Sequence, residues 1–229
     1  MTEPVRRKWR GIEPDARTAE RRQRLIDAAI DLLSTEGLSG TTVRAVCARA
    51  GLHSRYFYES FEDIDTLLVA VFDQLSASFL EEVSAAAEAA PDDPKARLQA
   101  AVQKSAEIVT RQTHLVRILN VEAIGNEQLN RRRIRMLHDI AWMIEQDAYR
   151  VYGAPAQGEQ IGTLSARFLA AGFAELLIAW VGGELDAEAE ELAADATELM
   201  LAVSEKARQL ALSRAAERPR TSRRSRGTA

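Results

Sequence analysis

The sequence predicts an all-α protein of about nine helices, and three observations support this. Apolar residues recur at spacings of three and four along most of the 229 residues, which is the period of a helix with one buried face. Aromatic residues make up only 6% of the chain while alanine is abundant, a composition that favours helix over sheet. Strict alternation of apolar and polar residues, the sign of a strand, is found in no segment.

The sequence predicts three helices within its first 60 residues, and glycines end the first two. A helical pattern begins near Ala19 and ends at Gly37, because glycine readily adopts the left-handed conformation that follows a helix. The threonine pair at 41–42 can cap a second helix, which Gly51 interrupts. A third short helix is expected over 54–60.

Longer amphipathic helices follow. The first keeps one face apolar until the segment "PDDP" breaks it, where Asp93 can cap the next helix and Pro94 suits its first position. The longer helices are expected, in order, at 62–89, 94–111, 114–124, 127–152, 159–182 and 187–212.

Charge is distributed unevenly along the chain. Residues 1–60 carry a net charge of +3, residues 61–213 carry −12 and residues 214–229 carry +5, within a total of −4. This pattern predicts an anionic partner at one end of the molecule only. The ends themselves, 1–18 and 213–229, are interpreted as a flexible basic arm and a disordered basic tail, which either add DNA contacts or only aid solubility.

The compartment follows from cysteine usage and from the absence of apolar leader signals. Cys47 is the only cysteine, so a reducing compartment is expected, with Cys47 a small buried apolar residue or, as the alternative, a redox switch. The N-terminus is too polar for a signal peptide. The longest apolar stretch, Phe168 to Gly183, contains Glu175 and is shorter than the roughly 20 residues of a membrane span. We therefore expect a cytoplasmic protein with no membrane partner.

Catalytic and metal-binding patterns are missing from the sequence. The three histidines, His53, His114 and His138, lie far apart, and no HExxH, CxxC or phosphate-binding glycine loop is present. The expectation is a protein that is not an enzyme and that holds no cofactor or metal. An all-helical enzyme whose site is gathered from distant residues is the alternative.

The segment "GLHSRYFYESF", residues 51–61, forms part of a helix-turn-helix candidate: two short helices joined by a glycine-containing turn. At 100° per residue, Phe57 and Phe61 share one face, whereas Arg55 and Glu59 lie on the opposite side. The pattern therefore predicts that the two phenylalanines are buried and that the charged pair faces outward.

The outward face has the chemistry of a DNA-binding surface. Arg55 can form two hydrogen bonds to guanine, and the hydroxyls of Tyr56 and Tyr58, at the margins of this face, can donate to phosphates. Glu59 either orients Arg55 or accepts from a cytosine amino group. The alternative is that Arg55 and Glu59 form a solvated surface pair with no role in binding.

The string "RLIDAAIDLLSTEGLSGTTVRAVCARAGLHSRYFYESFEDIDTLL", within residues 24–72, resembles the DNA-binding domain of TetR-type transcriptional regulators. The resemblance implies a helix-turn-helix domain at 19–65 and a helical ligand-binding and dimerisation domain at 66–212. Ile64 stands where the family often has a phosphate-binding lysine. The DNA contacts implied by the resemblance are Thr42, Arg44, His53, Ser54, Arg55, Tyr56, Tyr58 and Ser60.

The resemblance also implies a set of dimer-interface residues and a set of effector-binding residues. A homodimer would pair the last two long helices through an apolar face consisting of Phe173, Leu176, Leu177, Trp180, Leu199, Met200 and Val203; the alternative is that these residues complete the core of one chain. A small-molecule effector would bind near Glu122, His138, Trp142, Arg167, Phe168 and Phe173. The arginines at 131–133 and 135 are interpreted as a solvated face, with binding of a phosphate-bearing ligand such as an acyl-CoA as the alternative.

The function implied is that of a sequence-specific DNA-binding transcriptional regulator, a repressor released from double-stranded operator DNA by a small, largely apolar ligand. A dimer would place two recognition helices in successive major grooves. The alternative is a ligand-independent DNA-binding or architectural protein.

Overall fold

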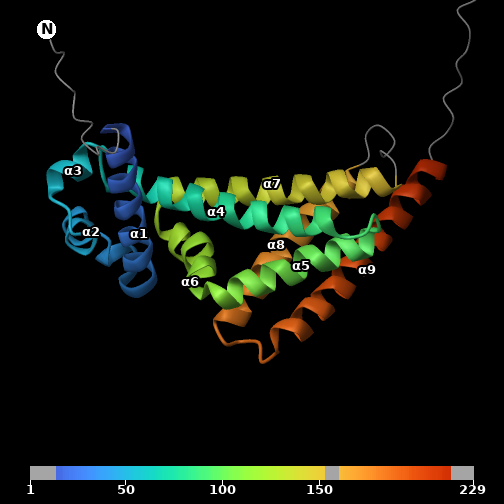
Figure 1. Ribbon diagram of the computed structural model, residues 1–229. Helices are drawn as coiled ribbons and strands as arrows, with labels where there is room; N and C mark the ends of the chain where they lie inside the picture. Colours follow the sequence, from blue (N-terminus) through green and yellow to red (C-terminus); the bar gives the residue numbers. More distant parts are fainter. Residues whose placement is uncertain (1–13, 153–159, 218–229) are drawn as a thin grey trace, which may run out of the picture. The chain divides into compact units, whose positions relative to one another are not determined.

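The computed structural model describes residues 14–152 and 160–217, and their regular structure is helical throughout (Figure 1), which confirms the predicted all-α class. Most of the helices expected from the sequence begin and end within a few residues of their predicted limits. In chain order the helices are α1 Pro14–Gly40, α2 Val43–Ala50, α3 Ser54–Tyr58, α4 Ile64–Ala89, α5 Pro94–Arg111, α6 Thr113–Val116, a π-helical turn Arg117–Val121, a 3₁₀ turn Glu122–Gly125, α7 Glu127–Tyr152, α8 Ile161–Val181 and α9 Ala189–Glu217.

The chain forms two compact units, and the first is discontinuous in sequence. Unit 1 comprises the described parts of residues 1–76 together with 117–131, and unit 2 comprises those of 77–116 and 132–229. The helix-turn-helix domain expected at 19–65, called the head below, lies within unit 1. Its predicted boundary with a ligand-binding domain stays a prediction.

Unit 1 is built around α1 and is densely packed. Leu25, Leu32 and Leu33 on one face of α1 are almost fully buried, as the three-and-four spacing predicts. The helix is interrupted at Gly37, whose φ of 70° and ψ of −170° are accessible essentially only to glycine. This confirms the stop predicted at Gly37, although a further helical turn continues to Gly40.

The segment after α5 departs from the prediction. A regular helix was expected over 114–124, but the chain forms the short α6, the π-helical turn Arg117–Val121 and the 3₁₀ turn Glu122–Gly125. Several side chains of this irregular segment, among them Ile118, Leu119 and Ala123, are buried. The irregular backbone therefore coincides with dense packing in unit 1.

Two helices extend further than the sequence analysis expected. α1 begins at Pro14 rather than near Ala19, so residues 14–18 of the expected arm are helical, which fits the preference for proline in a first helical turn. α9 continues to Glu217, so residues 213–217 of the expected tail are helical as well. The remaining parts of the arm and tail, 1–13 and 218–229, lie outside the described residues.

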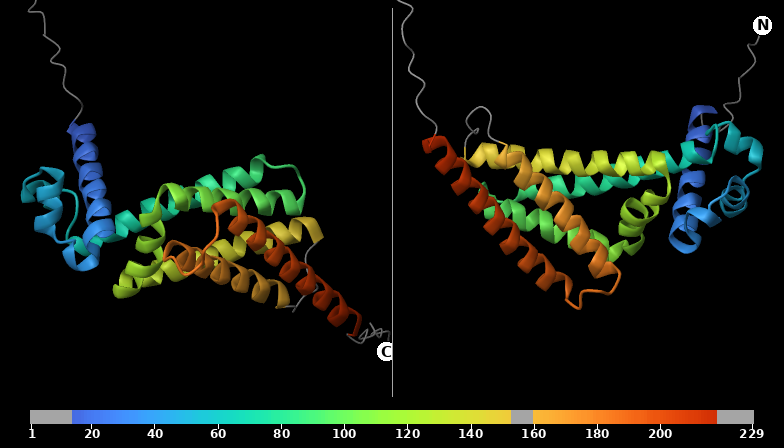
Figure 2. Two further views of the ribbon diagram at one scale, coloured as in Figure 1. Left: turned by 90° about the horizontal axis from the view of Figure 1, so that it is seen from below. Right: turned by 180° about the vertical axis from the view of Figure 1, so that it is seen from behind.

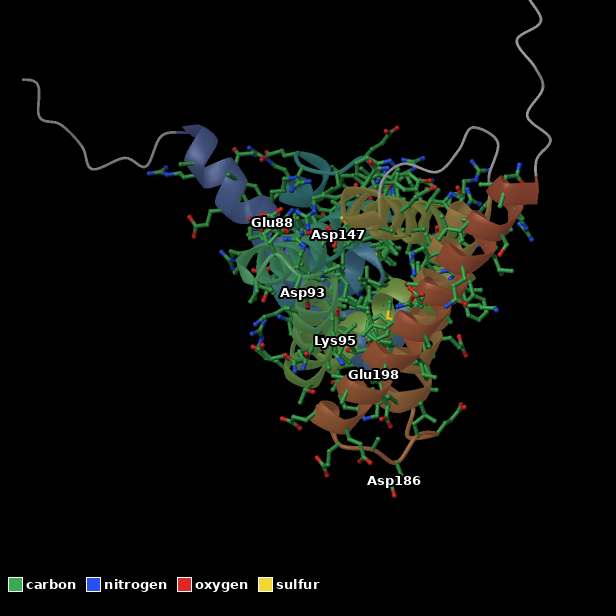
Figure 3. All side chains as sticks on the ribbon, turned by 90° about the vertical axis from the view of Figure 1, so that its right-hand side faces the viewer. Glu88, Asp93, Lys95, Asp147, Asp186 and Glu198 are labelled. Atoms are coloured by element: carbon green, nitrogen blue, oxygen red, sulfur yellow. The ribbon has the colours of Figure 1, made fainter. Side chains whose placement is uncertain are left out.

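Unit 2 is organised around α5, α8 and α9, which lie side by side (Figure 2). Its main core is rich in alanine, and aromatic and aliphatic side chains that are only partly buried pack around it. At its surface the ammonium of Lys95 on α5 lies 2.7 Å from a carboxylate oxygen of Glu198 on α9 (Figure 3). The buried residues of this core are Val102, Ala106, Leu169, Ala193, Ala196 and Met200.

Helix α8 carries an unusually exposed apolar surface. Among the described helices it is long and apolar enough to cross a membrane, judged by length and composition alone. Only 22% of its most apolar 18-residue stretch is buried. The apolar stretch expected from the sequence is shorter than a membrane span because it starts at Phe168, whereas the helix begins at Ile161. Leu164 and Phe168 of α8 are 58% and 67% exposed.

Candidate nucleic-acid interface

Helices α2 and α3 are joined by a tight turn with a left-handed residue at its start. Thr42 caps α2, because its hydroxyl oxygen accepts from the amide of Ala45 at 3.2 Å. Gly51 ends α2 with φ 63° and ψ 36°. From α1, the guanidinium of Arg24 donates to the carbonyl of Ala50 at 2.6 Å, so the end of α2 is tied to the first helix.

The core side of α3 is aromatic. Phe57 is fully buried and Phe61 is 3% exposed, which confirms the inward face predicted from the helical period. Their ring centroids lie 5.8 Å apart. Tyr58 packs edge-on against Phe57 but remains 62% exposed. One turn of helix therefore buries one ring and presents the next to solvent.

The outward side of α2 and α3 presents the residues expected to contact DNA. The side chain of Arg55 is 76% exposed. His53 caps α3, with its Nδ1 accepting from the amide of Arg55 at 3.3 Å. Of the expected DNA contacts, Thr42, Arg44, His53, Ser54, Arg55 and Tyr58 are exposed, and Tyr56 and Ser60 are half-buried.

Glu59 links two arginines on this surface. The Nε of Arg55 donates to one carboxylate oxygen of Glu59 at 3.0 Å. The other carboxylate oxygen lies 3.6 Å from Nη2 of Arg21 on α1. The Arg21 guanidinium also lies over the ring of Tyr56, 4.7 Å from its centroid. Arg55 and Glu59 are predicted from the sequence, but Arg21 is not, because it is one of several arginines between residues 17 and 24.

In α2 and α3, two side chains have pKa values shifted from their ordinary values. The hydrogen bond from Arg55 to Glu59 and the negative charge of Glu59 raise the pKa of the Arg55 guanidinium. Burial raises the pKa of the Cys47 thiol. Cys47 is 7% exposed, which confirms the prediction that it is a buried residue.

Glu122 holds the irregular segment against α1 within unit 1. One carboxylate oxygen accepts from the amide of Leu38 at 3.0 Å, directly after the break at Gly37, and the other accepts from Nε of Arg117 at 3.0 Å. Arg117 also donates to the carbonyl of Ser34 at 3.3 Å. The amide exposed by the glycine break thus receives its partner from a residue far along the chain.

The residues expected to bind an effector are divided between the two units. Glu122 belongs to unit 1, with the two contacts just described, and the other five belong to unit 2. Phe173 packs against the alanine-rich core of unit 2. The exposed members are His138, Trp142, Arg167 and Phe168. Effector binding by these residues remains a prediction.

The residues expected at a dimer surface also differ in burial. Leu177 and Met200 are 6% and 7% exposed and belong to the core of unit 2 itself. Leu199 is 63% exposed. The remaining members, Phe173, Leu176, Trp180 and Val203, are partly buried against the same core. A partner surface on this side of the unit therefore has Leu199 and the neighbouring exposed residues of α8 as its available apolar groups.

Comparison with known proteins gives consistent matches. The family described as "Bacterial regulatory proteins, tetR family" matches residues 25–71. The HTH-type transcriptional regulator BetI of Paraburkholderia xenovorans is 28% identical over 171 residues, which is 73% of this chain and 84% of that protein.

Solved structures resemble the fold over most of its length. The fatty acid degradation regulator FadR from Bacillus halodurans superposes with a TM-score of 0.68 at 17% identity, over 79% of this chain and 94% of that one. FadR from Bacillus subtilis, solved in complex with stearoyl-CoA, gives 0.66 at 16% identity, over 78% and 96%.

Proposed function

The chain belongs to the TetR family of bacterial transcriptional regulators, and on this premise we propose that it is a DNA-binding repressor that leaves its operator when a small, largely apolar ligand binds. The repressing sign and the ligand are the parts of this proposal that go beyond the family. Because bacterial operator DNA lies in the cytoplasm, the protein is proposed to act there.

The observation that carries the proposal is the orientation of α3. With Phe57 and Phe61 buried, Arg55 and Tyr58 are presented on a solvent-exposed side, and Thr42 at the start of α2 is exposed as well. Arginine is the side chain that pairs best with guanine, and threonine and tyrosine hydroxyls donate to phosphates. The arrangement supports a role for α3 as the element that enters a major groove.

Selection of operators from genomic fragments tests the DNA-binding part. The wild-type protein should retain a small set of fragments that share a pseudo-palindromic sequence. Arg55→Ala should weaken binding to that sequence by about 1–3 kcal/mol and relax its base preference, and Tyr58→Ala should weaken binding without relaxing the preference. Arg131→Ala, on an exposed side chain of α7, is the control and should leave affinity unchanged. Unaltered affinity in both α3 variants would contradict the assignment of this face.

Dimerisation is part of the proposed operator model. One helix-turn-helix contacts only a half-site, so two copies are needed to read a palindrome. Leu164, Phe168 and Leu199 are each more than half exposed. Large exposed apolar surfaces on α8 and α9 are typical of interaction sites, which favours a second copy of this chain as their partner.

An apolar effector is supported by one of the structural relatives. FadR from Bacillus subtilis was solved with stearoyl-CoA, which joins a long apolar chain to a phosphate-bearing group. Titrating stearoyl-CoA into the protein–operator complex should release DNA, while coenzyme A alone should not. A ligand shifts the equilibrium only by its difference in affinity for the bound and free states, so release requires weaker binding to the DNA-bound form. Tighter operator binding upon titration would contradict the proposed sign.

A further inference from the structure

The charged contacts around α3 form a continuous chain, from α1 to the exposed end of Arg55. Arg21 approaches one oxygen of Glu59, and Glu59 accepts from Nε of Arg55 through its other oxygen. Resting on the DNA-binding function proposed above, we propose that Glu59 is a positioning residue, which fixes Arg55 to read a guanine in each operator half-site, and that Arg21 holds Glu59 in place.

The backbone fixes the position of Glu59. Its amide donates to the carbonyl of Arg55 at 3.1 Å, where the last turn of α3 closes. The spacing of four residues places both side chains on the same face of the helix. Glu59 is also only 36% exposed, against 76% for Arg55, so the carboxylate is the more restricted of the two partners.

The hydrogen bond to Glu59 leaves the two terminal nitrogens of Arg55 free to contact DNA. The guanidinium group has five N–H donors, and Glu59 engages the one on Nε. Within the part of the chain that the structure describes, the terminal nitrogens of Arg55 have no hydrogen-bond partner. Two terminal N–H groups can donate in parallel to O6 and N7 of guanine, the adjacent acceptor pair that guanine alone presents in the major groove.

Arg21 offsets the negative charge of Glu59, which would otherwise oppose phosphate binding on this surface. An unpaired Glu59 would repel DNA, but between Arg21 and Arg55 it belongs to a group with a net charge of +1. Arg21 is in turn placed by the Tyr56 ring beneath its guanidinium. Restricting the Arg55 side chain before binding reduces the conformational entropy that it loses in the complex.

The test measures base preference at each operator position, at one fixed salt concentration. Operators are first selected with the wild-type full chain, and binding is then compared for single-base changes in the wild type and in Arg55→Lys, Glu59→Ala, Glu59→Gln and Arg21→Gln. Glu127→Gln is the matched control, because Glu127 and Arg131 form an exposed pair with the same spacing in unit 1. Thermal unfolding of each variant checks its fold.

The wild type should prefer guanine at one position per half-site by about 5- to 150-fold, the range for one bidentate pair. Arg55→Lys and Glu59→Ala should each reduce this preference at least about fivefold and leave other positions unchanged. Glu59→Gln should keep most of it, since its amide oxygen can still accept from Nε, and Arg21→Gln should reduce it less than Glu59→Ala does. The control should match the wild type.

Three outcomes would overturn the inference while leaving the proposed function intact. One is an operator with no guanine position that responds to Arg55→Lys. Another is an equal rise in affinity for all sequences in Glu59→Ala and Glu59→Gln, which would mean that Glu59 only repels phosphates. The third is loss of a cytosine preference in Glu59→Ala, which would mean that Glu59 itself reads a base. Failure of the wild type to select any sequence would instead refute the proposed function.

Discussion

The two units bury their apolar residues in different ways. Among the described residues, eleven of the twelve largest fully buried side chains lie in unit 1 and one, Ile108, lies in unit 2. Nine large apolar side chains of the described ranges remain exposed, and six of these lie in unit 2. Unit 1 is thus the smaller part of the chain but holds most of the large side chains that are completely enclosed.

This difference distinguishes a unit that encloses most of its large apolar side chains from a unit that leaves several of them exposed. Dense burial of large side chains gives the DNA-binding helices a rigid base, so that their outward side chains are held in defined positions. The core of unit 2 is lined by alanines and leaves exposed leucines and a phenylalanine on α8 and α9. A second subunit would cover such a surface, which is the reason for proposing a homodimer through these helices.

The largest expected effect tests the dense packing of unit 1. Phe57→Ala should lower the free energy of unfolding of this unit by about 3–5 kcal/mol, because a fully enclosed ring leaves a cavity. Hydrogen exchange of the α2 and α3 amides measures it for this unit alone. Tyr58→Ala is the control: its exposed ring should cost no more than the roughly 0.5–1.5 kcal/mol of its contact with Phe57. Equal losses in both variants would refute the contrast between the two rings.

The next effect tests the incomplete surface of unit 2. Phe168→Glu and Leu199→Glu should each raise the dissociation constant of the dimer at least about 100-fold, or about 2.7 kcal/mol, because each places a charge in an apolar contact. Sedimentation over a range of concentrations gives this constant. Ile124→Glu introduces the same charge at a 61%-exposed position of unit 1 and should leave the dimer intact. A dimer that resists both unit 2 substitutions must use another surface.

A smaller effect tests how unit 1 holds its distant segment. Glu122→Ala should destabilise unit 1 by about 1–3 kcal/mol, because the amide of Leu38 loses its acceptor in a site where the Glu122 side chain is only 15% exposed. Glu122→Gln should cost less, since its amide oxygen can still accept. Faster hydrogen exchange at Leu38 in the alanine variant is the expected readout. Exchange as slow as in the wild type would show that this hydrogen bond contributes nothing.

Local signals in the sequence were enough to predict the helices of the head. Gly37 and Gly51 interrupt their helices, as predicted from their places after apolar helical runs, and both have positive φ. Thr42 caps α2, and the helical period alone separated the buried Phe57 from the exposed Arg55. In each case the deciding interaction lies within a few residues of the chain, which is why periodicity and capping rules could find it.

The sequence did not predict features that depend on distant partners. The segment 114–124 contains no proline or glycine, so no helix-breaking residue in it indicates the π-helical and 3₁₀ turns. The contact between Glu122 and Leu38 joins residues 84 positions apart. The approach of Arg21 to Glu59 likewise depends on how α1 packs against α3. Assignment of an effector site is limited in the same way, because its residues must be gathered by the fold.

The discontinuity of unit 1 has a practical consequence for the design of chimeras, in which the DNA-binding part of one regulator is joined to the remainder of another. A fragment cut after residue 76 would leave Ile118, Leu119 and Leu129 behind, and these three side chains are almost completely enclosed in the intact unit. Such a truncated head would carry a hydrophobic gap and the unsatisfied amide of Leu38. A chimera should therefore transfer residues 117–131 together with the N-terminal segment, so that α2 and α3 keep the core of unit 1 when they are joined to a different unit 2.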